Sequence, residues 1–258
     1  MTRYISLLFV AVLLTACGKE KKETTEPETP ALAFKTETYT KKTSLPCKDH
    51  CAVVNIEIPI AEGIPVASDS INKTIFNTIR KIIFFGEKPY TATTYEDLNT
   101  SFIGSYEDLK KQFPEDAIGW EGKVKGTIDY QTDKVLNIKL NHYTYTGGAH
   151  GYEGNTSLLF NPGTGKVLKY SDIFKDEAAF KAFAEKKFRA KFKVPEGKGI
   201  NSTGFMFEDE VFALPLNIFF KENGLLLYYN SYEIASYAEQ QKELLLPYSE
   251  IEQFLKIK

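Results

Sequence analysis

The stretch GWEGKVKGTIDYQTDKVLNIKLNHYTY, residues 119–145, decides the predicted fold. Residues 119–130 and 134–145 each have the length and composition of a strand, and the polar turn at 131–133 between them predicts a β-hairpin. In the second strand, apolar side chains from Leu136 to Leu140 alternate with polar ones. Because successive side chains of a strand point to opposite faces, we expect one buried face and one polar face.

Further strands and helices are expected on both sides of this hairpin. Strands are predicted at 52–60, 157–160, 216–220, 225–230 and 243–246, and helices from Asp69 or Ser70, from near Ser105 to Pro114, over 176–192, and from Ser249 with Glu252 completing a capping box. The first helix is predicted from isoleucines at helical spacing, which are Ile71, Ile75, Ile79 and Ile82. Strands outnumber helices and come in hairpins, so the fold class is α+β, with a mainly antiparallel sheet and about three packing helices.

Composition excludes several classes of protein. The chain has 258 residues, 43% of them hydrophobic, with 19 Phe and 15 Tyr, which is too aromatic for a mostly disordered chain. The formal net charge of −2 argues against a partner of nucleic acid, because binders of phosphate backbones usually carry a basic excess. A polytopic membrane protein is excluded as well, since the sequence has one long apolar run, at its N-terminus.

That N-terminal run predicts a secreted protein. Arg3 precedes an apolar stretch at 5–14, which is shorter than the roughly 20 residues that span a bilayer. The following Leu-Thr-Ala-Cys resembles the lipobox of bacterial lipoprotein precursors, which implies a signal peptide at 1–16 and acylation of Cys17. The alternative is an ordinary signal peptide that ends beside a cysteine. We expect a protein bound to a bacterial membrane by its N-terminal lipid, at the periplasmic face or the cell surface of the outer membrane.

Residues 17–33 predict a flexible tether, because charged residues and prolines follow Cys17 with almost no bulky apolar groups.

The other two cysteines, Cys47 and Cys51, are four positions apart, and outside the cytoplasm such a pair favours a disulfide. His50 between them leaves a metal site as the alternative, although zinc needs a fourth ligand that no downstream motif supplies.

The stretch Gly163-Thr164-Gly165-Lys166 has part of the composition of a phosphate-binding loop. That motif requires four residues between its glycines and Ser or Thr after the lysine, whereas one residue and Val167 stand here. We therefore predict a hairpin turn.

Two stretches go beyond what folding requires: YTYTGGAHG at 143–151 and YYNSYEIASYA at 228–238. Together with Gly165-Lys166 and the closing LPYSE at 246–250, they resemble the extracytoplasmic domain family of the lysozyme-sensing anti-sigma factor RsiV and the peptidoglycan deacetylase PdaC. The resemblance implies a small PdaC-like α+β subdomain at 34–115 and an RsiV-like α+β domain at 116–258. It also implies a binding module that is not an enzyme, since the catalytic domain of the deacetylase is a separate one.

Candidate binding residues lie in these stretches: Tyr145, Gly147, Gly148, His150, Tyr152, Tyr232, Glu233 and Tyr237. Adjacent glycines allow a sharp turn with positive φ, and tyrosines offer a rigid apolar face with a polar tip. The alternative is that the tyrosines cover the sheet and His150 holds the turn together. The second stretch departs from the family pattern, with Ser236 in place of proline and Gln240 and Gln241 where glycine is expected, which puts lysozyme binding in question.

Three functions are compatible with the sequence. The first is a non-enzymatic envelope lipoprotein that recognises lysozyme, a peptidoglycan fragment or another envelope protein, with no cofactor and no metal. The second is a structural or assembly component of an envelope complex. The third is a metal-dependent hydrolase that uses His142, His150 and Glu153, although such a site needs three converging ligands around an open position.

Overall fold

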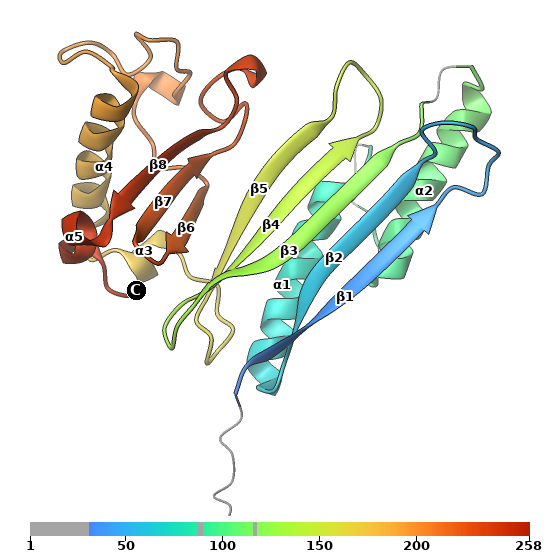
Figure 1. Ribbon diagram of the computed structural model, residues 1–258, viewed down its shortest axis with the longest axis horizontal. Coiled ribbons are helices and arrows are strands. Elements are labelled where there is room, and N and C mark those ends of the chain that lie inside the picture. The colour runs from blue at the N-terminus through green and yellow to red at the C-terminus, as the bar shows by residue number, and fades with distance from the viewer. Residues whose placement is uncertain (1–30, 87–89, 116–117) are drawn as a thin grey trace, which may run out of the picture. The chain divides into compact units, whose positions relative to one another are not determined.

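The structure is a computed structural model that describes residues 31–86, 90–115 and 118–258 (Figure 1). Within it, Ala31–Lys258 form one compact unit. The predicted signal peptide, Cys17 and nearly all of the predicted tether lie outside the described residues. Among those described, no helix combines the length and the apolar character that crossing a bilayer requires.

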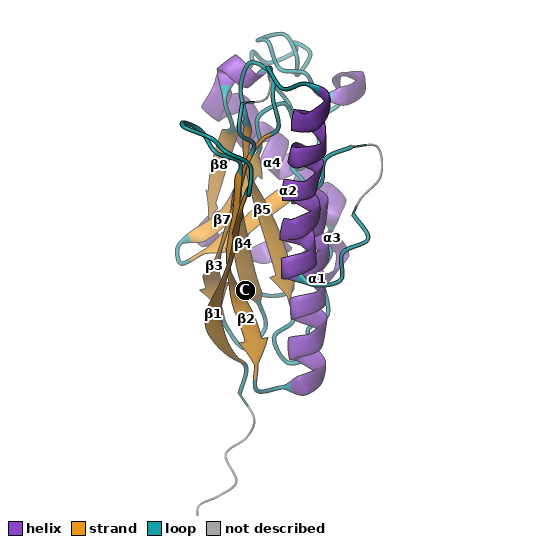
Figure 2. Cartoon of the chain, turned by 90° about the vertical axis from the view of Figure 1, so that its right-hand side faces the viewer, coloured by secondary structure: helices purple, strands orange, loops and turns teal. Residues whose placement is uncertain are grey.

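The first sheet has five strands in the order β1-β2-β3-β4-β5. Its strands are β1 (Ala33–Lys42), β2 (Val53–Glu62), β3 (Glu121–Gln131), β4 (Leu136–Tyr145) and β5 (Tyr152–Phe160). Every neighbouring pair is antiparallel except β2 and β3, which are parallel. Parallel neighbours need a crossover connection, and the helices α1 (Pro65–Ile83) and α2 (Tyr95–Gln112) provide it. Figure 2 shows both helices on the same side of this sheet.

The core beside this sheet forms between alternate apolar side chains of β2 and apolar side chains at helical spacing on α1. Val54, Ile56 and Ile58 of β2 are fully buried. Against them lie the fully buried isoleucines of one face of α1, Ile71, Ile75, Ile79 and Ile83. On the other face of β4, Lys139, Asn141 and Tyr143 are partly exposed, as predicted, whereas Asn137 is fully buried.

The second sheet has three antiparallel strands, β6 (Asn217–Lys221), β7 (Gly224–Tyr229) and β8 (Lys242–Pro247). The helices α3 (Tyr170–Ile173), α4 (Glu177–Phe192) and α5 (Tyr248–Ile251) belong to the same half of the chain. Short 3₁₀ turns cover Glu208–Glu210, Tyr237–Glu239 and Glu252–Phe254. Phe188 of α4 is fully buried, and its ring lies 4.9–5.8 Å from the rings of Phe205, Phe207, Phe212 and Tyr229.

Asparagine and serine side chains join the two sheets. The backbone N–H of Ser157 in β5 donates to Oδ1 of Asn217 at 2.8 Å, and that of Phe220 in β6 donates to Oδ1 of Asn137 at 2.9 Å. The Ser157 hydroxyl donates to the carbonyl of Ile218 at 2.5 Å. Because these amides are buried, their hydrogen bonds avoid the cost of unpaired polar groups and fix how β5 meets β6.

Most predicted elements are confirmed. The chain is α+β in two mostly antiparallel sheets, with three long helices, and the hairpins at 119–145 and 216–230 form. The helix predicted at 176–192 begins where expected, because the side chain of Asp176 accepts from the backbone N–H of Ala179 at 2.9 Å. The predicted domain division at 115/116 falls between α2 and β3. The strands before it, β1 and β2, belong to the same sheet as the strands after it, β3 to β5. The division itself stays a prediction.

Three predicted helix starts are wrong. The first helix begins at Pro65, because the fixed φ of proline suits the first position of a helix. Ser70 does not cap this helix, and its hydroxyl donates to the carbonyl of Gly165 at 2.8 Å. The second begins at Tyr95 rather than near Ser105, because the Thr94 side chain accepts from the N–H of Asp97. The last begins at Tyr248 after Pro247, without the capping box predicted at Ser249.

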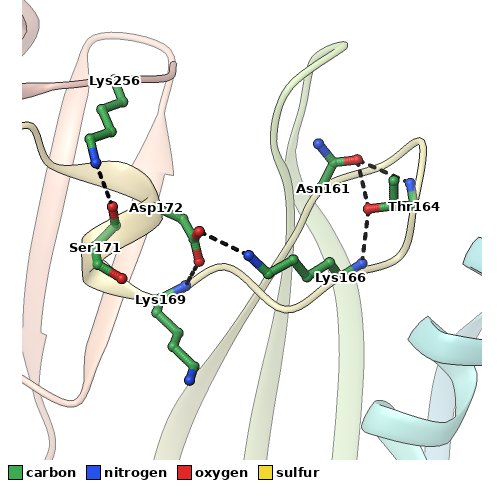
Figure 3. A network of polar contacts seen from close by, with 7 residues as sticks. All are labelled: Asn161, Thr164, Lys166, Lys169, Ser171, Asp172 and Lys256. Atoms are coloured by element: carbon green, nitrogen blue, oxygen red, sulfur yellow. Dashed lines mark hydrogen bonds and ion pairs between the residues drawn. The ribbon is translucent and has the colours of Figure 1, made fainter.

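Two local predictions are confirmed. Cys47 and Cys51 form a disulfide, which leaves neither thiol for a metal. The stretch 161–166 is a hairpin turn, closed by the N–H of Asn161 donating to the carbonyl of Lys166 at 2.9 Å. Figure 3 shows that the ammonium of Lys166 contacts Asp172, 3.0 Å away, so this lysine is held by a carboxylate of its own chain.

Candidate functional site

The two stretches singled out in the sequence meet through a stack of three rings. The imidazole of His150 lies on the phenol ring of Tyr237, with 4.2 Å between centroids and 13° between planes. The ring of Tyr232 follows, 5.4 Å from Tyr237 and inclined by 29°. The hydroxyl of Tyr237 also donates to the carbonyl of Gly151 at 3.4 Å. The structure thus brings together three of the predicted binding residues from separate parts of the chain.

Glycines shape the loop between β4 and β5 that carries His150. Gly147 and Gly148 have φ of 108° and 88°, which L side chains rarely adopt. The hydroxyl of Tyr145 donates to the carbonyl of Gly148 at 3.1 Å, so this tyrosine holds the turn. Gly151 is buried against the ring of Tyr143, and a Cβ there would lie 2.4 Å from that ring. The predicted glycine-rich turn is confirmed.

Glu233 holds the second loop, which runs from 230 to 241 after β7. One oxygen of its carboxylate accepts from the backbone N–H of Leu216 at 2.7 Å, and the other accepts from that of Asn230 at 2.9 Å. Burial raises the pKa of Glu233, while the two backbone hydrogen bonds act in the opposite direction. Its carboxylate positions the loop, and a direct contact with a ligand stays a prediction.

Asn230 fastens this loop to β5. Its side-chain Oδ1 accepts from the backbone N–H of Asn155 at 2.8 Å, and its Nδ2 donates to the carbonyl of Asn155 at 2.9 Å. The amide thereby pairs with both backbone groups of one strand residue, as a neighbouring strand would. Asn155 in turn donates from its own Nδ2 to the Tyr228 hydroxyl at 2.6 Å.

A pocket of about 440 Å³ lies beside the ring stack, within the roughly 300–1,000 Å³ range of small-ligand sites. It is lined by Glu153, Asn155, Tyr228, Asn230, Ser231, Tyr237, Ala238, Gln240 and Gln241. Tyr237 belongs to both the stack and the pocket. The sequence indicated Tyr237 as a binding residue and Glu153 as part of the metal alternative, but it did not indicate Asn155, because polar residues on the open face of a strand are ordinary in sequence.

The two departures from the family pattern keep the backbone that the family residues favour. Ser236, where proline is expected, has φ of −63°, close to the value that a proline ring fixes. Gln240, where glycine is expected, has φ of 56° and ψ of −174°, a region that is essentially restricted to glycine. The backbone of this loop is therefore compatible with the proline and glycine of the family pattern, although its side chains differ.

The alternative metal triad is not assembled. Paired residues of antiparallel strands share a face, and His142 pairs with Gly154 while Tyr143 pairs with Glu153, so His142 and Glu153 lie on opposite faces. Burial lowers the pKa of His142 to about 4. Within the described residues, no three His, Cys, Asp or Glu side chains are grouped to hold a metal ion.

Tyr152 is a predicted binding residue that belongs neither to the ring stack nor to the pocket lining. Its half-buried ring lies 6.0 Å from that of His142, and it is not among the pocket-lining residues. Burial raises its pKa.

Comparison with known proteins agrees with the resemblance seen in the sequence. The family model described as deacetylase PdaC matches residues 45–153, and that of a protein of unknown function, DUF3298, matches residues 171–249. No curated protein matches the chain.

Two solved structures have the same fold. A DUF3298 family protein from Pseudomonas aeruginosa PAO1 has 20% identity and a TM-score of 0.64, over 88% of this chain and 96% of that one. A member of the DUF3298 family from Bacteroides fragilis NCTC 9343 has 24% identity and a TM-score of 0.64, over 88% and 94%. The chain therefore carries a PdaC/DUF3298-type domain, in which a region that matches PdaC is followed by one that matches DUF3298.

Proposed function

We propose that this protein is a lipid-anchored component of the bacterial envelope that acts by binding a ligand, without catalysing a reaction. The ligand is lysozyme or a peptidoglycan-related molecule, and it contacts the ring stack of His150, Tyr237 and Tyr232 together with the adjoining pocket. The lipid on Cys17 holds the protein on its membrane, and the tether places the site away from the headgroups.

The observation that carries this proposal is the stack itself. Its rings come from two loops that glycines, Glu233 and Asn230 hold in place, so little side-chain entropy is lost when a ligand arrives. Tyr232 is 59% exposed although it is aromatic and sits at φ of 69°, a conformation that costs a non-glycine residue energy. Rigid, partly exposed tyrosines of this kind serve protein and sugar recognition.

The ligand class rests on the family resemblance and on the loop path. RsiV, which shares the glycine-rich and tyrosine-rich stretches, senses lysozyme. Ser236 and Gln240 have backbone angles that suit the proline and glycine of the family pattern. This supports a shared mode of recognition with altered side-chain contacts.

Binding is tested with residues 17–258 carrying Cys17→Ser, which removes the acylation site. Lysozyme and purified muropeptides are titrated into this protein in a calorimeter, and the hydrolysis of peptidoglycan is followed in parallel. Saturable binding of one of them without turnover supports the proposal. Turnover of peptidoglycan by the protein alone would overturn it.

The anchor is tested separately, by growing producing cells with radioactive palmitate. The wild-type protein should be labelled and remain with the membrane fraction, and Cys17→Ser should lose both properties. The variant Cys47→Ser/Cys51→Ser is the matched control, because it removes two cysteines of the chain and keeps the label. Equal labelling of wild type and Cys17→Ser would refute acylation at this position.

A further inference from the structure

We propose that the pocket beside Tyr237 binds a cationic side chain, an arginine or lysine of a protein ligand. This inference rests on the proposed function, because it names the chemical group that the binding site takes up. Three properties of the pocket support it: its negative charge, its hydrogen-bond acceptors without a partner in the described chain, and the apolar surface of its tyrosine rings.

Glu153 is the one charged residue among those that line the pocket. None of the ion pairs among the described residues involves it; its contact is with Nδ2 of Asn141, 3.3 Å from Oε1. A carboxylate at the edge of a concave site and without a cationic partner attracts a cation.

The two chain segments that supply the pocket contain no lysine or arginine, and Lys242, which follows the second segment, contacts Glu239 at 3.2 Å. The chain has 32 Lys and Arg residues, yet none lies in 140–165 or in 222–241, the two segments that supply the pocket. Lys221, which precedes the second segment, is held by Asp129 at 2.6 Å. The carboxylates of a peptidoglycan peptide would meet repulsion here, whereas a basic side chain would not.

The remaining walls suit a long basic side chain. Asn155 and Asn230 already use their amides within the protein, so they form fixed walls. Ser231, Gln240 and Gln241 make no side-chain hydrogen bond to another described residue, and their oxygens can accept from a guanidinium or ammonium group. The rings of Tyr228 and Tyr237 supply apolar surface along which the methylene groups of arginine or lysine can pack.

Three small probes test the inference by nuclear magnetic resonance: N-acetyl-arginine amide, its neutral isostere N-acetyl-citrulline amide, and the trisaccharide chitotriose. Each is titrated into ¹⁵N-labelled residues 17–258 carrying Cys17→Ser. The arginine probe should shift the backbone signals of Glu153, Ser231 and Gln241 in a saturable way. The citrulline probe should bind about tenfold more weakly, because it lacks the charge.

Matched variants separate a local site from general electrostatics. Glu153→Gln removes the pocket carboxylate and should weaken the arginine probe about tenfold. Glu239→Gln removes a neighbouring carboxylate that is exposed like Glu153 but does not line the pocket, and affinity should stay within about twofold because this carboxylate lies outside the site.

Two results would overturn the inference: an unchanged arginine affinity in Glu153→Gln, or chitotriose shifting these signals while the arginine probe does not. The second result would identify a glycan site. Loss of lysozyme and muropeptide binding with retention of the arginine site would contradict the proposed function alone, so the two failures can be told apart.

Discussion

The imidazole of His150 lies face to face on the phenol ring of Tyr237, 4.2 Å away and 13° from parallel. His150 comes from the turn between β4 and β5, and Tyr237 from the loop after β7. Each loop has its own support, the positive-φ glycines in the first and Glu233 with Asn230 in the second. The contact therefore links the PdaC region to the DUF3298 region at the place where binding is proposed.

Truncating this stack should weaken binding more than it weakens the fold. We expect Tyr237→Ala to lower the affinity for the bound envelope ligand by about tenfold or more, because partly exposed, rigid aromatic anchors dominate interfaces. The free energy of unfolding should fall by less, about 1 kcal/mol, since the ring is only partly buried. Tyr237→Phe keeps the ring and should bind nearly as wild type. Calorimetric titration and urea unfolding measure both quantities, and equal affinities of Tyr237→Ala and Tyr237→Phe would contradict the role of the ring.

The amide of Asn230 should matter for stability through its two bonds to Asn155. In Asn230→Ala, the buried N–H and carbonyl of Asn155 lose their partners, and the free energy of unfolding should fall by about 1–3 kcal/mol. Asn223→Ala, in an exposed turn of the same hairpin, should change it by about 0.5 kcal/mol or less. Urea unfolding of both variants checks this. A similar loss of stability in both variants would mean that the two hydrogen bonds between Asn230 and Asn155 make no specific contribution.

Local patterns predicted the hairpins and the amphipathic helices because their signals lie within a few residues. The second helix start was missed, since Thr94 competes with Ser105 as a cap, and Ser105 instead donates to the carbonyl of Ser101. β1 was missed because its charged residues and threonines give no clear alternation, and its pairing with β2 decides its structure.

The candidate site was predicted in part. Its tyrosines, glycines and His150 were apparent from sequence, since such residues have little reason to cluster in ordinary turns. The hydrogen bonds between Asn155 and Asn230 could not be predicted, because the two residues are 75 positions apart and only the folded chain places the Asn230 amide beside β5. The structural role of Glu233 likewise depends on Leu216, which lies in another segment.

His142 should make stability depend on pH. Burial lowers its folded pKa to about 4 from 6.5, so below pH 6.5 the unfolded chain takes up a proton that the folded chain refuses. As the pH falls from 6.5 to 4, the free energy of unfolding should therefore decrease, by about 3 kcal/mol from this residue. Well above pH 6.5, where His142 is neutral in both states, it should contribute no slope.

Urea unfolding at a series of pH values, compared between wild type and His142→Gln, isolates this effect from that of the carboxylates. The variant should lose about 3 kcal/mol less on acidification. Parallel curves for wild type and His142→Gln would show that His142 is not buried in its neutral form.

Gln240 should be a position where glycine stabilises the protein. Its backbone, at φ of 56° and ψ of −174°, is strained for a residue with a Cβ. Gln240→Gly should raise the free energy of unfolding by about 1 kcal/mol, the strain relieved exceeding the entropy that glycine adds to the unfolded chain. Gln241→Gly, its neighbour without positive φ, should lower it instead. Thermal unfolding of both variants measures these changes. A lower stability of Gln240→Gly would contradict the inferred backbone strain.

The proposal that a preformed two-loop site binds an envelope ligand without turnover is tested most directly by one titration. Lysozyme and muropeptides are added in turn to residues 17–258 carrying Cys17→Ser, in a calorimeter, with Tyr237→Ala as the paired sample. We predict saturable one-to-one binding of one of them at micromolar concentration, about −8 kcal/mol, that Tyr237→Ala weakens. Absence of binding by both at about 100 µM, or equal binding by the two proteins, would contradict the account.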